Sequence, residues 1–234
     1  QRSGYMPCAA RAEDGEKPLS YRLVYSDKAV KNVSICISRD GEVVVFHDET
    51  LDRVTGYHGY LRDLTVSELK RLDASSGFRG LYGKNEIPTL REFLELVAPT
   101  ELIVNMELKN NRQYYPRLEE KVIALVRAFG MEKRVIFSSF NNVSILSCRR
   151  LAPEIDAGFL WKCPVIGQAG QYCRDNDVQF FMPDGNYLSD DIVADFRAHG
   201  IRLAPWTANS LPEIRRLADW DVYCINTNYP NLRK

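Results

Sequence analysis

The sequence has no excess of charge of either sign and no long apolar run. Its 31 Lys and Arg residues balance its 31 Asp and Glu residues, so the chain carries no net field that would gather nucleic acid or an anionic membrane. We therefore expect no nucleic-acid partner. No stretch approaches the roughly 18 apolar residues of a membrane-spanning helix, so we expect no membrane span in this chain.

The cysteines lack any pattern that carries chemistry. The six of them are scattered and form no C-x-x-C pair, which argues against a zinc or redox site. A chain of 234 residues needs no disulfide framework, so we expect reduced and mostly buried thiols. No signal peptide is visible, which favours a cytoplasmic protein. The chain opens at Gln1 rather than Met, and a removed leader or membrane segment is left open.

What the sequence does have is a repeating order of strand and helix. From Glu101 onward, β-branched runs such as ELIVNMELK and RVIFSSF are each followed by a stretch with helical spacing of apolar residues. Pro116 predicts the start of one such helix and Gly130 its end. Continuous apolar strands are typical of a parallel sheet with a covered outer face. Eight or nine such strands predict a single TIM (β/α)8 barrel domain over residues 1–234.

The N-terminal half departs from this regular order. The runs SICIS and EVVVFHD flank Asp40-Gly41, a dipeptide typical of a tight hairpin turn. After the His47 strand, residues 54–88 form a loop and helix excursion, in which Thr65 and Glu68 predict a capped helix. Loops at the rim of a barrel commonly hold substrate contacts.

His47 has the most informative position of the three histidines. It ends an apolar run and precedes two acidic residues, so we expect it at the barrel rim with an acid beside it. That position fits a catalytic acid or base, and it equally fits a strand-end histidine that a neighbouring carboxylate satisfies. His199 falls in the last turn of a predicted helix and His58 in a loop, where neither needs a function.

Glu107 and Lys109 lie two residues apart near the end of a predicted strand, so both side chains point to one face. At the carboxyl end of a barrel strand that face is the barrel mouth. The pair is either a buried ion pair, which the spacing alone favours, or a metal ligand with a phosphate-binding neighbour. Phe140 and Trp206 also end predicted strands, where they could wall a pocket or cap the core.

Six motifs, in their order and spacing, resemble the glycerophosphodiester phosphodiesterase family. They are EVVVFHDETLDRVTG, IPTLREFLELV, NMELK, VIFSSFN, PWTAN and INTNYP, and the resemblance runs from about Tyr21 to the end of the chain. It implies a TIM barrel that binds one divalent cation, commonly calcium or magnesium, and hydrolyses glycerophosphodiesters to sn-glycerol 3-phosphate and an alcohol. It also implies three acidic metal ligands and two histidines that act as acid, base or nucleophile.

Only part of that site carries over to this chain. The resemblance assigns His47 to the second histidine, Glu107 to the third metal ligand and Lys109 to its basic partner. The contacts expected for a substrate or its phosphate are Arg2, Lys109, Phe140 and Trp206.

The other two metal-ligand positions have lost their carboxylates. They fall on Asn32 and Ser34, and Gln1 stands where the first histidine is expected. A hard divalent cation prefers charged oxygen ligands, so we expect calcium or magnesium to bind weakly or not at all. The missing histidine would remove a general acid or base, and such a group raises the reaction rate on the order of 10²- to 10⁴-fold.

The sequence leaves three functions to weigh. The first is a catalytically impaired barrel that binds a phosphodiester or phosphate ligand at its mouth. The second is an active hydrolase with a rebuilt metal site, whose ligands would come from Asp48, Glu49, Asp184 or Glu16. The third is a structural or scaffold barrel, which the retained rim residues disfavour. Whether the chain is an enzyme stays open, and the sequence predicts no oligomeric state.

Overall fold

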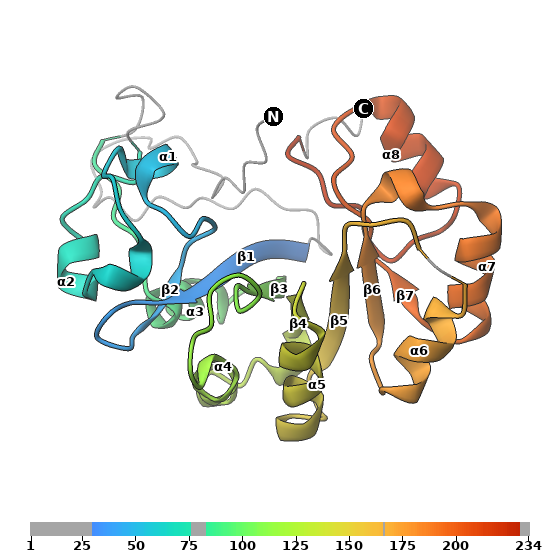
Figure 1. Cartoon of the computed structure of the whole chain (residues 1–234), viewed down its shortest axis with the longest axis horizontal. Helices are drawn as coiled ribbons and strands as arrows, with labels where there is room; N and C mark the ends of the chain where they lie inside the picture. The colour runs from blue at the N-terminus through green and yellow to red at the C-terminus, as the bar shows by residue number, and fades with distance from the viewer. Residues whose placement is uncertain (1–29, 76–82, 166, 230–234) are drawn as a thin grey trace.

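The computed structural model describes residues 30–75, 83–165 and 167–229, in which strands and helices alternate (Figure 1). The strands are β1 (Val30–Ile37), β2 (Val43–Val45), β3 (Ile103–Leu108), β4 (Val135–Ser139), β5 (Asp156–Trp161), β6 (Phe180–Pro183) and β7 (Arg202–Leu203). The helices are α1 (Asp52–Thr55), α2 (Val66–Leu69), α3 (Leu90–Val97), α4 (Leu118–Ala128), α5 (Asn142–Leu151), α6 (Ala169–Asp175), α7 (Asp190–Ala198) and α8 (Leu211–Ala218). Short 3-10 turns are η1 (Leu61–Asp63), η3 (Glu132–Arg134) and η4 (Gly185–Tyr187).

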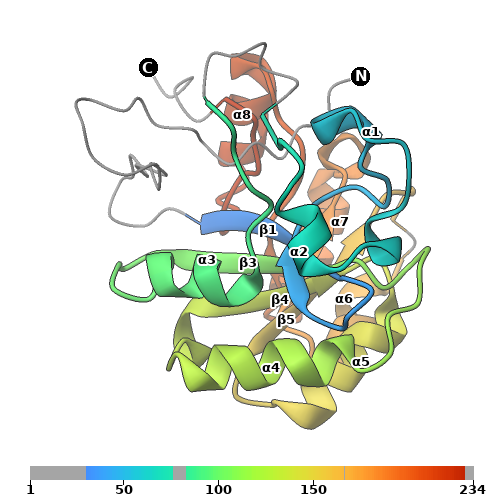
Figure 2. The ribbon, with the colours of Figure 1, turned by 90° about the vertical axis from the view of Figure 1, so that its left-hand side faces the viewer.

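The described strands form one curved sheet of seven in the order β2-β1-β3-β4-β5-β6-β7. Every neighbouring pair is parallel except β1 and β2, which form the predicted hairpin. Figure 2 shows α3, α4 and α5 packed along the outside of the sheet, as expected for parallel strands with a covered outer face. The predicted TIM barrel fold is confirmed.

The segment after α8 runs beside β7 and continues the ring of strands. The Tyr223 amide donates to the Leu203 carbonyl at 2.9 Å, and the Asn226 amide donates to the Pro205 carbonyl at 3.0 Å. Asn226 belongs to the motif INTNYP, and Tyr223 lies two residues before that motif. Within the described ranges, backbone hydrogen bonds do not join this edge to β1, so side chains make that connection.

The β1–β2 hairpin returns the chain to the barrel mouth. Gly41 takes a φ of +83° in its turn, a conformation that glycine adopts without strain. The Asp40 carboxylate accepts from Ser38 Oγ at 2.6 Å and from the Val66 amide at 3.1 Å, which ties the turn to the start of α2. The excursion that contains α1 and α2 is thereby held against the barrel.

Alternation along the strands divides the side chains between two cores. The larger core lies between the sheet and its helices and includes Val33, Ile35 and Ile37 from β1. A smaller apolar cluster is formed by side chains of the opposite alternation on β4, β5 and β6 and by the residue that follows β7, namely Ile136, Leu160, Phe180, Met182 and Ala204. The corresponding positions on β1 and β3 are polar, and they are Asn32, Ser34, Asn105 and Glu107.

The helix starts follow local capping chemistry. Thr65 with Glu68 forms a complete capping box at the start of α2, as the sequence predicts, and Thr89 with Glu92 forms another at the start of α3. The predicted start of α4 at Pro116 is two residues too early. Arg117 has a φ of 62°, which lies in the left-handed region, so the helix begins only at Leu118.

Gly158 on β5 gives a test of the close packing inside the barrel. A Cβ at this position would lie 2.7 Å from Cβ of Phe180 and 3.2 Å from its carbonyl oxygen. We expect Gly158→Ala to lower the free energy of unfolding by roughly 1–3 kcal/mol, because the neighbouring strand must shift. Gly83→Ala is the matched control, since no atom of the described residues lies within 4 Å of its added Cβ. Equal effects of the two variants in urea unfolding would contradict this packing.

Candidate functional site

The candidate site centres on the buried carboxylate of Glu107 at the end of β3. Lys109 Nζ lies 2.8 Å from Oε1, and Ser34 Oγ donates to Oε2 at 3.0 Å. Ser34 reaches this oxygen because it pairs with Glu107 across β1 and β3. The ion pair that the spacing favours is confirmed, and both carboxylate oxygens already have partners within the protein.

His47 joins this pair from the other side. Its Nε2 lies 3.3 Å from Lys109 Nζ, and its Nδ1 lies 2.6 Å from Asp48 Oδ1. Because an ammonium group can only donate, these contacts fit an imidazole that carries its proton on Nδ1 and accepts at Nε2. The expected position of His47 beside an acidic residue is confirmed. Its catalytic role stays a prediction.

Asp48 connects His47 to the excursion. Burial raises the pKa of this carboxyl, but hydrogen bonds from His47 and Arg53 outweigh that effect and hold it well below its usual range. Arg53 Nε on α1 donates to Asp48 Oδ2 at 2.6 Å. The contribution of Arg53 was not predicted from the sequence, although it stands only five residues after Asp48 in the same motif.

Three amide side chains cross the barrel interior below the mouth. Asn105 Nδ2 donates to Asn32 Oδ1 at 2.9 Å, and Asn32 Nδ2 donates to Asn226 Oδ1 at 2.5 Å. Asn226 Nδ2 donates in turn to the carbonyls of Ala204 and Pro205, each at 3.0 Å. This amide chain, Asn105–Asn32–Asn226, links β3 and β1 to the last segment of the barrel, where backbone hydrogen bonds do not.

Sequence reasoning missed two members of the amide chain. Asn105 lies two residues before Glu107, so strand alternation places both on the same face. Asn226 lies in the motif INTNYP at the end of the chain. Both signals were visible, but nothing in a single sequence shows that the two amides meet at Asn32.

The donor set does not fit a hard divalent cation. Such an ion prefers several oxygen ligands with negative charge. Here Glu107 is the one carboxylate among the three expected ligands, and its charge is balanced by Lys109. In residues 30–75, 83–165 and 167–229, no three His, Cys, Asp or Glu side chains gather in a way that could hold a metal.

Two of the carboxylates considered as replacement ligands, those of Asp48 and Asp184, have other contacts. Asp48 is bound by His47 and Arg53, and Asp184 accepts from the Asn186 amide at 3.0 Å at the start of η4. The Glu49 carbonyl accepts from the Leu61 amide at 3.0 Å, which fixes the backbone of the excursion. Glu16 lies outside the described residues, as do Gln1 and Arg2.

Phe140 and Trp206 meet at the rim. Their rings make an edge contact with centroids 5.7 Å apart, and both pack on the inner apolar cluster. Trp206 Nε1 donates to the Met182 carbonyl at 2.8 Å, and the Trp206–Thr207 peptide bond is cis. They cap this part of the core, which is one of the two roles that the sequence allowed. Their contact with a ligand stays a prediction.

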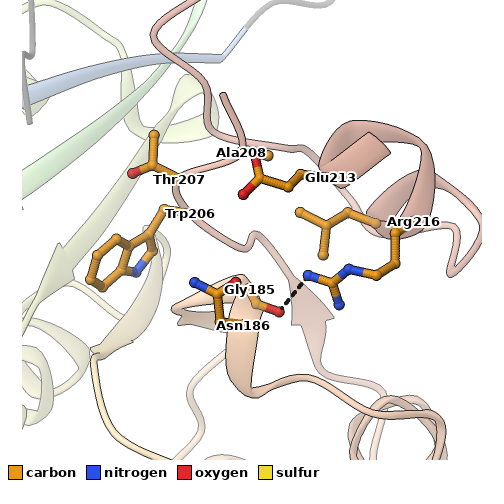
Figure 3. A pocket seen from close by; sticks show the side chains of 8 residues that line it. Gly185, Asn186, Trp206, Thr207, Ala208, Glu213 and Arg216 are labelled. Atoms are coloured by element: carbon orange, nitrogen blue, oxygen red, sulfur yellow. Dashed lines mark hydrogen bonds between the residues drawn. The ribbon is translucent and has the colours of Figure 1, made fainter. Parts of the chain in front are cut away.

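A small hollow lies beside Trp206, at the ends of β6 and β7 (Figure 3). Arg216 Nη2 donates across it to the Gly185 carbonyl at 3.0 Å. Its volume is about 10 Å³, which is about the space of one water molecule.

The other histidines lie where the sequence places them. The His58 side chain is 92% exposed and contacts Asp52 in the excursion. His199 follows the last turn of α7, with Nδ1 2.8 Å from the Asp195 carbonyl. The cysteines of the described ranges are free thiols, and most of them are buried. No helix in these ranges is long and apolar enough to cross a membrane.

Asp48 gives a test of the site's electrostatics. A carboxyl with a depressed pKa stabilises the fold fully above its unfolded value of about 3.9, and this contribution is lost as the pH falls. We expect Asp48→Asn to lower the free energy of unfolding by roughly 1–3 kcal/mol at pH 7. The difference in the free energy of unfolding between Asp48→Asn and the parent should become smaller as the pH falls toward 3.

Urea unfolding at pH 7, 5 and 3 measures this difference. Asp63→Asn serves as control, because the Asp63 side chain is 65% exposed and its nearest basic atom, on Arg62, is 3.8 Å away. A loss of the same size at every pH for Asp48→Asn would show that its charge is not what stabilises the site.

Known proteins are similar to this chain in both sequence and fold. The glycerophosphoryl diester phosphodiesterase family model matches residues 35–232. A glycerophosphodiester phosphodiesterase from Caldanaerobacter subterraneus is 32% identical over 198 residues, which cover 85% of this chain and 81% of that protein.

Two solved structures extend the comparison. A glycerophosphodiester phosphodiesterase from Agrobacterium tumefaciens is 26% identical with a TM-score of 0.75, covering 87% of this chain and 85% of that one. A phosphodiesterase from Oleispira antarctica, in complex with the product sn-glycerol-3-phosphate, is 28% identical with a TM-score of 0.73. The match covers 85% of this chain and 81% of that one. The chain described here therefore belongs to the glycerophosphoryl diester phosphodiesterase family.

Proposed function

We propose that this chain binds a glycerophosphodiester or its phosphate product at the barrel mouth and hydrolyses it slowly or not at all. The observation that carries the proposal is that the Glu107 carboxylate is already bound by groups of the protein. Its two oxygens are bound by Lys109 and Ser34, so the carboxylate is neutralised by the protein itself. Metal-dependent members of the family are expected to use this carboxylate for a cation.

Lys109 supports the binding half of the proposal. Its side chain is 15% exposed, and its ammonium group lies between Glu107 and His47. An ammonium has three N–H donors, and these two contacts use two of them. The third can donate to a phosphate oxygen, which makes a charge-assisted hydrogen bond. The Oleispira relative, which holds sn-glycerol-3-phosphate, supports this class of ligand.

The donor chemistry supports the impaired half of the proposal. Phosphodiester cleavage needs positive charge on the nonbridging oxygens and an acid or base on each side of phosphorus. Lys109 can supply one positive charge, but Glu107 offsets part of it. His47 Nε2 already contacts Lys109, so this histidine is not free to exchange a proton with a ligand until that contact opens.

An active hydrolase remains the second candidate. The relative from Caldanaerobacter subterraneus, which is 32% identical, is named for this activity. A cation held by ligands outside the three expected positions would support hydrolysis. The two candidates differ in whether sn-glycerol 3-phosphate is released or only bound.

The binding half is tested by calorimetry with sn-glycerol 3-phosphate in the presence of chelator. We expect Lys109→Met to weaken affinity by about tenfold or more, because a charge-assisted hydrogen bond is worth roughly 1.5–3 kcal/mol. Lys133→Met is the matched control, since Lys133 is exposed on η3 before β4, at the opposite end of the barrel. Equal affinity of the Lys109 variant and the parent would exclude this mode of binding.

The same preparations decide the catalytic half. Release of sn-glycerol 3-phosphate from glycerophosphocholine is followed with calcium, with magnesium and with chelator, beside His47→Ala. The proposal expects at most slow release that neither calcium nor magnesium raises. Metal-dependent release that disappears in the variant would establish the active hydrolase instead.

Restoring the two lost carboxylates should create a cation site. Ser34→Asp places a carboxylate directly beside Glu107, and Asn32→Glu adds one on the same face of β1. Without metal these charges repel, and the amide chain is broken, so we expect the double variant to melt at a lower temperature than the parent in chelator. Calcium or magnesium should restore much of that loss through binding to the folded state.

Thermal unfolding of both proteins, with and without divalent cation, measures this effect. The matched control is Asn226→Ala, which breaks the amide chain but adds no carboxylate. It should unfold at a lower temperature than the parent, and calcium should change that temperature little. A double variant that responds no more than this control would show that the two substitutions are not what removed the cation site.

A further inference from the structure

A buried carboxyl outside the candidate site has contacts from uncharged groups. Glu119 is 8% exposed and lies in the first turn of α4. Its Oε1 accepts from Asn110 Nδ2 at 2.9 Å and from Ser144 Oγ on α5. The positive end of the α4 dipole favours a carboxyl there. Burying such a group among neutral donors is nevertheless costly, so its place calls for an explanation beyond packing.

The contact with Asn110 fixes the loop between β3 and α4. Asn110 is 5% exposed, and all of its side-chain polar contacts are internal to this region. Its Oδ1 accepts from the Tyr115 amide at 2.7 Å, while its carbonyl accepts from Asn141 Nδ2 at 2.7 Å. Glu119 therefore holds Asn110, to which the Tyr115 end of the loop is hydrogen-bonded.

Asn110 directly follows Lys109. On the other side of Lys109, the Leu108 carbonyl accepts from Ser139 Oγ at 2.8 Å. The Lys109 amide itself donates to the Ile35 carbonyl at 3.1 Å. The backbone of Lys109 is thus fixed before it by the sheet and after it by Asn110. A lysine side chain is long and flexible, so the place of its ammonium group depends on both fixed points.

We propose that Glu119 is a positioning residue, which acts through Asn110 to keep the Lys109 ammonium between Glu107 and His47. Its effect on a phosphate ligand rests on the proposed function. Its effect on the contact between Lys109 and His47 does not, because that contact exists without ligand. The two effects are measured separately.

The contact is tested by the ¹⁵N chemical shift of His47 Nε2 in the ligand-free protein. The chain has three histidines, so His47→Ala assigns the signal. Glu119→Ala should move this signal, because Lys109 no longer stays against the ring. Glu119→Gln should restore the parent value, since its amide oxygen accepts the same two hydrogen bonds. Val126→Ala, a buried change in the same helix, controls for general loss of stability.

Affinity for sn-glycerol 3-phosphate is the second readout. We expect Glu119→Ala to weaken it about tenfold, with Glu119→Gln and Val126→Ala close to the parent. If Glu119→Ala does not fold, Asn110→Ala breaks the same link while leaving Glu119 its contact with Ser144.

The outcomes separate the two proposals. If the His47 Nε2 shift does not move in Glu119→Ala, or in Asn110→Ala where that variant is used instead, the positioning role is wrong. The role is also wrong if Val126→Ala moves the shift by the same amount. A signal that moves only when the link is broken supports it. If the parent also binds no sn-glycerol 3-phosphate, the proposed function fails while the positioning role stands.

Discussion

The site depends on how a single buried carboxylate is neutralised. Glu107 lies inside the barrel, where an unpaired charge is costly, and Lys109 and Ser34 supply its partners. The ion pair places the Lys109 ammonium at the mouth and brings it to His47. These contacts within the protein hold Glu107, Lys109 and His47 together at the barrel mouth.

Asn32 and Ser34, where the resemblance implies carboxylates, make structural contacts in this chain. Two further carboxylates beside Glu107 would repel each other strongly in the absence of a cation, because their charges share a poorly solvated space. Asn32 avoids this repulsion, and its amide can both donate and accept. It therefore joins Asn105 to Asn226 and links β1 to the end of the barrel. The neutral amide of Asn32 therefore both avoids that repulsion and forms the cross-barrel link.

The rim is held by contacts that lie behind the residues facing the mouth. Arg53 fixes Asp48, which in turn orients His47, and the excursion is thereby tied to the site. On the opposite side, Glu119 holds Asn110 next to Lys109. Both supports come from helices, which are more rigid than the loops that carry the rim. The geometry of the mouth is therefore set by residues that need not touch a ligand.

The sequence by itself determined the fold and half of the site. Period-2 spacing placed Glu107 and Lys109 on one face, and the apolar run before His47 placed it at the rim beside Asp48, because these are local properties of a strand. Strand and helix order predicted the barrel for the same reason. The start of α4 was misplaced, because Pro116 does not predict the left-handed backbone conformation of Arg117, after which the helix begins.

Only the tertiary structure decided which side chains meet. Asn32 and Asn226 are 194 positions apart in the chain, and Ser34 and Glu107 are 73 apart, so their contacts depend on the register between strands. The same holds for Glu119 and Ser144, which come together because α4 and α5 pack side by side. Local patterns predict where a side chain points, whereas the partner that neutralises it is fixed by the way distant segments pack.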